Sequence, residues 1–70
     1  MIHKTAIINP KAKISSDVEI GPYVIIGAGV EISEGSIIQS HVNINGNTFI
    51  GKNNKIYPFA SIGSHPQDMK

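Results

Sequence analysis

The chain has 70 residues, of which 40% are hydrophobic and only 6% aromatic, and it carries six lysines, no arginine and a formal net charge of +1. A chain this short buries a modest fraction of its surface, so its core needs further support. The absence of cysteine excludes disulfides and thiolate metal sites and favours a cytoplasmic setting. Its apolar runs are far shorter than a membrane span, and its scattered lysines form no basic stripe, so we expect neither membrane insertion nor nucleic-acid binding.

A six-residue repeat runs through the chain from its second residue. Ile fills every sixth position without a gap, although it makes up only one residue in five of the sequence. These positions are Ile2, Ile8, Ile14, Ile20, Ile26, Ile32, Ile38, Ile44, Ile50, Ile56 and Ile62. Two residues before the Ile positions lies a second series of mostly small residues: Ala6, Ala12, Val18, Val24, Val30, Ser36, Val42, Thr48, Asn54 and Ala60.

Each repeat predicts a short strand followed by a bend. Residues two apart on a strand point to the same face, so the small residue and the Ile face inward and the residue between them faces outward. In chain order the predicted strands are residues 6–8, 12–14, 18–20 and so on, in steps of six, to 60–62. The outward set includes Lys13, Glu19, Glu31, Asn43 and Lys55. Strand breakers occupy the other three places of the repeat: Pro10, Gly21, Pro22, Gly27, Gly29, Gly35, Gly46, Gly51 and Pro58.

A chain that bends by a constant amount every six residues must coil, and three repeats close one triangular rung of eighteen residues. Rungs stacked about 4.8 Å apart form three parallel sheets around columns of inward Ile. The sequence therefore predicts an all-β fold, a parallel β-helix of nearly four coils, with residues 1–70 forming a single segment. Neither an amphipathic helix nor a hairpin meander fits a strict period of six. Sequence physics does not give the hand of the coil, and the usual preference for crossovers is right-handed.

Two stretches are more specific than the repeat. The first is Ser40-His41-Val42 followed by Asn45-Gly46, and the second is Tyr57-Pro58-Phe59-Ala60-Ser61-Ile62-Gly63 followed by Pro66-Gln67-Asp68-Met69-Lys70. Within the second stretch Pro66 takes a small-residue position and Asp68 stands where Ile is due. With these motifs the chain resembles the N-terminal coils of the acyl-ACP:UDP-N-acetylglucosamine O-acyltransferase family, hexapeptide-repeat enzymes of lipid A synthesis. The resemblance implies a left-handed coil.

The resemblance also implies an activity. Family members are cytoplasmic homotrimers with active sites in clefts between neighbouring prisms, and they need no cofactor. They transfer a 3-hydroxyacyl group from acyl carrier protein to the 3-hydroxyl of UDP-N-acetylglucosamine. The catalytic base is a His from a later coil, and a backbone N–H helps to hold the oxyanion. This chain contains no such coil, so we expect it to be the N-terminal part of a longer chain and to be inactive alone. Because its last rung would leave unpaired backbone and an uncovered apolar triangle, we also expect the chain to be marginal as a monomer.

By position in the motif, Gln67, Asp68 and Lys70 are the candidate substrate-binding residues at the sugar-nucleotide end of the cleft. A carboxylate accepts hydrogen bonds from sugar hydroxyls, an amide both donates and accepts, and an ammonium binds a hydroxyl or a phosphate. On composition alone, Asp68 and Lys70 would instead belong to a solvated loop. No catalytic residue is predicted within the chain.

Two alternative functions remain open. One is another hexapeptide-repeat acyltransferase, such as the N-acyltransferase that acts later in the same pathway, although the P-Q-D-x-K segment argues against it. The other is a non-catalytic structural β-solenoid. An ice-binding or filament-forming solenoid needs a ladder of exposed Thr, and Thr5 and Thr48 are forty-three residues apart, which is not a multiple of six.

The histidines are candidates for catalysis or metal binding. His41 shares its place in the rung with Thr5, Tyr23 and Phe59, so it is predicted to lie in a ladder along one corner. There we favour packing or an inter-subunit contact over catalysis. Some hexapeptide-repeat proteins, the gamma-type carbonic anhydrases, bind zinc through interface His. Here His3, His41 and His65 are the only His candidates, their spacing gives no support for zinc, and we expect no metal site.

Overall fold

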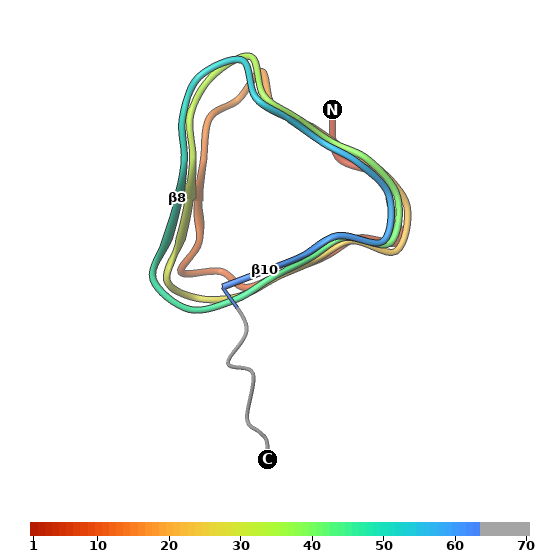
Figure 1. Ribbon diagram of the computed structural model, residues 1–70, viewed down its shortest axis with the longest axis horizontal. Helices are drawn as coiled ribbons and strands as arrows, with labels where there is room; N and C mark the ends of the chain where they lie inside the picture. Colours follow the sequence, from red (N-terminus) through yellow and green to blue (C-terminus); the bar gives the residue numbers. More distant parts are fainter. Residues whose placement is uncertain (64–70) are drawn as a thin grey trace.

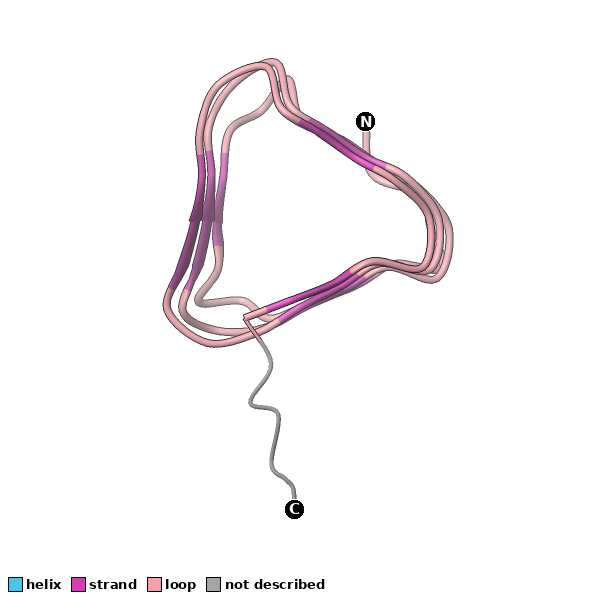
Figure 2. Cartoon of the chain, viewed as in Figure 1, coloured by secondary structure: helices cyan, strands magenta, loops and turns pink. Residues whose placement is uncertain are grey.

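The computed structural model describes residues 1–63, which coil into a triangular prism whose rungs overlie one another in Figure 1. Strands occupy the three sides and turns the three corners, as Figure 2 shows. Every strand ends on an Ile of the six-residue series. The strands are β1 (Ile7–Ile8), β2 (Lys13–Ile14), β3 (Glu19–Ile20), β4 (Ile25–Ile26), β5 (Val30–Ile32), β6 (Ile37–Ile38), β7 (Asn43–Ile44), β8 (Thr48–Ile50), β9 (Lys55–Ile56) and β10 (Ser61–Ile62).

From β4 onward, each strand pairs in parallel with the strand three places earlier in the chain, which lies one rung below it. The three sheets have the orders β1-β4-β7-β10, β2-β5-β8 and β3-β6-β9. Partners are eighteen residues apart, as in the pairs Ile8 with Ile26 and Ile14 with Ile32. The described residues thus complete three turns and add the first strand of a fourth. These pairings confirm the predicted parallel β-helix and its eighteen-residue rung; the rest of the nearly four predicted coils lies outside the described residues.

The core consists of the two series that the repeat predicts. All ten buried hydrophobic side chains within residues 1–63 belong to these series, and none of them is more than 7% exposed. Ile8, Ile14, Ile56 and Ile62, in the first and last rungs, are partly buried against this core. Ile2 is the exception to the predicted inward series: it bridges Ile20 but remains 50% exposed, because no rung lies beneath it to cover its side chain.

Candidate functional site

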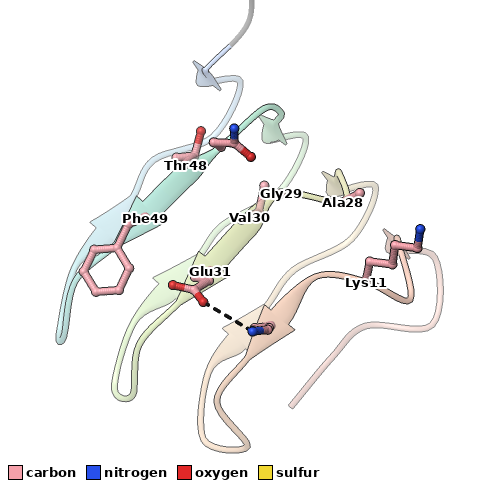
Figure 3. Close-up of a pocket in the computed structure, with 9 residues that line it drawn as sticks. Lys11, Ala28, Gly29, Val30, Glu31, Thr48 and Phe49 are labelled. Carbon is pink, nitrogen blue, oxygen red and sulfur yellow. Dashed lines mark ion pairs between the residues drawn. The ribbon is translucent and has the colours of Figure 1, made fainter.

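The outward face of the β2-β5-β8 sheet contains a hollow of about 310 Å³, shown in Figure 3. Lys11, Gly29 and Asn47 occupy equivalent positions in three successive rungs. The hollow lies at the middle position, where Gly29 has no side chain to fill it. Lys13 Nζ is 3.9 Å from Glu31 Oε2, and both side chains are largely exposed, so this ion pair stabilises the fold little. The Phe49 ring beside the hollow is 67% exposed. The lining combines the charged side chains of Lys11, Lys13 and Glu31 with apolar residues such as Phe49, a combination found at binding surfaces.

A ladder of rings runs along one corner of the prism. Tyr23, His41 and Phe59 have positive φ angles of 59°, 58° and 65°, a conformation that bulky residues rarely adopt. The ring centroids are 5.1 Å apart between Tyr23 and His41 and 4.8 Å apart between His41 and Phe59. Below the rings, Thr5 Oγ1 accepts a hydrogen bond of 2.9 Å from the Tyr23 N–H. The predicted corner ladder is therefore present, and within it His41 packs between two aromatic rings.

The outward face of the β1-β4-β7-β10 sheet is apolar in its lower rungs. Ile7 and Ile25 are paired neighbours on this face, and they are 64% and 44% exposed. Asn43 is next in the same row, and its Oδ1 is buried without a hydrogen-bond partner among the described residues. A buried acceptor without a partner is uncommon and costs stability. The sequence interpretation overlooked these outward apolar residues, although their position one residue before each inward Ile gives their direction.

The predicted substrate-binding residues Gln67, Asp68 and Lys70 lie outside the described residues. The structure describes the chain up to Gly63, which follows β10 with a φ of +76°. A Cβ at this position would overlap the Asn45 carbonyl oxygen and the Thr48 hydroxyl. Only glycine fits this combination of backbone angle and close approach, so the backbone conformation directly after β10 depends on Gly63.

Two further observations concern metal ions and membranes. Across residues 1–63, no three side chains of His, Cys, Asp or Glu come together in a group that could hold a metal ion. His65, one of the three histidines considered above, lies outside this range. No helix in the same part of the chain is long and apolar enough to cross a membrane.

Comparison with known proteins finds sequence relatives of these coils among bacterial transferases. Residues 1–34 match the bacterial transferase hexapeptide family, described as six repeats. The chain is 54% identical over 69 residues to the acyl-(acyl-carrier-protein):UDP-N-acetylglucosamine O-acyltransferase of Saccharophagus degradans, covering 99% of this chain and 27% of that protein. The enzyme of the same name from Thermodesulfovibrio yellowstonii is 56% identical, with the same coverage. The chain thus spans about a quarter of the length of the curated relatives it matches.

The solved structures give the same result. A crystal structure of UDP-N-acetylglucosamine acyltransferase superposes on the whole of this chain with a TM-score of 0.93 and 51% identity, and the chain covers 27% of it. Superposition preserves hand, so the coil shares the left-handed winding that the resemblance implied. Sequence and backbone therefore confirm the predicted resemblance: these coils are related over their whole length to coils of acyl-(acyl-carrier-protein):UDP-N-acetylglucosamine O-acyltransferases.

Proposed function

We propose that this chain supplies the first coils of a cytoplasmic enzyme that transfers a 3-hydroxyacyl group from acyl carrier protein to the 3-hydroxyl of UDP-N-acetylglucosamine, the first step of lipid A synthesis. One observation carries the proposal: sequence and backbone match proteins of this single named activity over essentially the whole chain. Because the chain spans about a quarter of those relatives, we propose that it works as the N-terminal segment of a longer polypeptide.

The proposed chemistry is an acyl transfer from a thioester to an alcohol. The sugar 3-hydroxyl attacks the thioester carbonyl, a C–O bond forms, the C–S bond breaks, and the carrier thiol leaves. A His from a later coil takes the hydroxyl proton, and a backbone N–H stabilises the oxyanion. In this scheme Gln67, Asp68 and Lys70 bind the sugar nucleotide, and the described coils provide the rigid wall from which that segment extends.

We further propose that the enzyme is a homotrimer in which the β1-β4-β7-β10 face is covered by a neighbouring prism. The apolar surface of this face supports the proposal. Ile7 and Ile25 expose adjoining apolar side chains on it. A neighbouring subunit would remove this apolar surface from water.

The proposed function can be tested with a chimera in which residues 1–70 replace the matching coils of the Saccharophagus degradans relative. We expect this chimera to acylate UDP-N-acetylglucosamine and the isolated 70-residue chain to show no transfer, because the base lies in a later coil. The Asp68→Ala variant of the chimera loses a charge-assisted hydrogen bond worth about 1.5 to 3 kcal/mol, so its KM for the sugar nucleotide should rise about 10-fold or more.

Glu19→Ala is the matched control, because Glu19 is an exposed carboxylate on the outward side of β3. It should leave both KM and kcat unchanged. A chimera that folds without transferring acyl groups would contradict the proposed activity. An unchanged KM for Asp68→Ala would contradict only the role of that residue.

A further inference from the structure

We propose that Asn45 is a site of spontaneous modification: its side-chain amide is lost through a cyclic imide formed with the backbone nitrogen of Gly46, leaving aspartate or isoaspartate. The proposal concerns the chemistry of one corner of the coil, and it does not depend on the proposed function.

The Gly46 amide is the feature that makes this corner reactive. Gly46 is exposed, has a φ of +72° and has no side chain to shield its nitrogen. Among residues 1–63 its N–H finds no hydrogen-bond acceptor, so neither sterics nor a hydrogen bond holds this nitrogen back. The Thr48 hydroxyl donates a hydrogen bond of 2.7 Å to the Asn45 carbonyl oxygen. This bond polarises the peptide group between Asn45 and Gly46 and makes its N–H easier to deprotonate.

The reaction balances without any added reagent except water. The deprotonated Gly46 nitrogen attacks Cγ of Asn45, an N–C bond forms, and a five-membered ring closes. The bond from Cγ to the side-chain nitrogen breaks, and that nitrogen leaves as ammonia with the proton that Gly46 gave up. Water then opens the ring at either carbonyl. One opening gives aspartate, and the other gives isoaspartate, in which the main chain passes through the former side chain.

Four of the other asparagines of the described coils, Asn9, Asn43, Asn47 and Asn53, are protected by their neighbours. Asn9 precedes Pro10, which has no N–H. Asn43 precedes the fully buried, β-branched Ile44. The amide that follows Asn47 donates to the Gly29 carbonyl oxygen at 3.2 Å, and the amide that follows Asn53 donates to Ser36 Oγ at 3.2 Å. The backbone nitrogens that would attack Asn47 and Asn53 thus donate hydrogen bonds. The Gly46 nitrogen, which would attack Asn45, donates none within residues 1–63.

Isoaspartate at position 45 would disturb the attachment of the last described strand. The Asn45 N–H donates to the Ile62 carbonyl oxygen at 3.0 Å and extends the pairing of β7 with β10. The Asn45 carbonyl oxygen also lies against Gly63 and accepts the bond from Thr48. The extra main-chain carbon would move this carbonyl away from both groups. We therefore infer that the modification loosens the corner from which the chain leaves β10.

Peptide mapping by mass spectrometry tests this proposal. The folded chain is incubated at mildly alkaline pH, and each asparagine is followed for the mass increase of an amide that becomes an acid. We expect Asn45 to react at least about 10-fold faster than Asn47, which corresponds to about 1.4 kcal/mol of barrier, and to give isoaspartate as well as aspartate. The Asn45→Gln variant should lose the fast phase, because glutamine would have to close a larger ring.

A parallel incubation in urea separates the contribution of the fold from that of the sequence. The ratio of the Asn45 rate to the Asn47 rate should be larger in the folded chain, because folding engages the Thr48 N–H but not the Gly46 N–H. Equal rates at the two asparagines in the folded chain would overturn the proposal. So would a ratio that falls on folding.

Discussion

Ser36 is the one fully buried polar side chain of the described core, in a column otherwise filled mainly by Ala and Val. Its hydroxyl donates a hydrogen bond of 2.7 Å to the Gly51 carbonyl oxygen and accepts one of 3.2 Å from the Asn54 N–H. A buried hydroxyl without partners would destabilise the core. Here it satisfies two backbone groups of the corner above it, so Ser36 combines the small volume that the column needs with a link between rungs.

Replacing Ser36 by Ala should therefore destabilise the coil despite the conserved volume. The Gly51 carbonyl and the Asn54 N–H would both lose their hydroxyl partner, and we expect the free energy of unfolding to fall by about 1 to 3 kcal/mol. Ser16→Ala, at an exposed position, is the control and should change it by less than about 0.5 kcal/mol. Urea denaturation of the two variants makes the comparison. A loss for Ser36→Ala no larger than that for Ser16→Ala would show that the hydrogen bonds contribute nothing net.

His41 shows what sequence position can and cannot reveal about a single residue. Its spacing of eighteen from Tyr23 and Phe59 placed it correctly in a corner ladder. The spacing did not predict that all three residues would adopt positive φ angles. Such angles are unfavourable for bulky side chains, and the ring contacts of about 5 Å offset part of that cost. This tertiary compensation is not visible in a local motif.

At the scale of the strand, the repeat predicted nearly everything about the interior and less about the exterior. The inward direction of a strand residue follows from its phase, because side chains alternate and one face is closed by the rest of the coil. The strands themselves are shorter than the predicted three residues in eight of ten cases. The small residue of the other triplets, such as Val24, contributes its carbonyl to the ladder but lies at the end of a turn.

β8 offers a direct test of which strand residues face the core, because two neighbouring apolar residues on it face opposite ways. Ile50 is 7% exposed and Phe49 is 67% exposed. Ile50→Asn would bury an amide without partners and remove a core side chain, and we expect a loss of about 4 kcal/mol or more, enough to prevent folding of a small domain. Phe49→Asn should change stability by less than about 1 kcal/mol. Circular dichroism and denaturant titration of both variants provide the comparison, and similar losses for the two would contradict the assigned direction of the strand.

At the scale of the whole molecule, the sequence predicted the fold of the described coils but not the surfaces on which they act. The interior repeats with a fixed period, so every rung carries the same information. The outer surface does not repeat: the three faces carry different rows, and the hollow beside Gly29 depends on one missing side chain. The candidate residues Gln67, Asp68 and Lys70 were found only through motif resemblance, because they lie where the repeat breaks, and they remain a prediction.

The proposed trimer gives the last test, since it assigns a role to one of the three faces. In the chimera, Ile25→Lys would place an ammonium on the β1-β4-β7-β10 face, where Ile25 adjoins Ile7 and Asn43. If a neighbouring prism covers this face, the variant loses apolar burial worth about 2 kcal/mol per subunit and must also desolvate a charge. We expect the trimer to dissociate to monomers at concentrations where the parent chimera stays assembled, as measured by sedimentation velocity.

Phe49→Lys is the matched control, because Phe49 is equally apolar and more exposed but lies on the β2-β5-β8 face. Dissociation of the Phe49 variant with an intact Ile25 variant would assign the subunit contact to the other sheet.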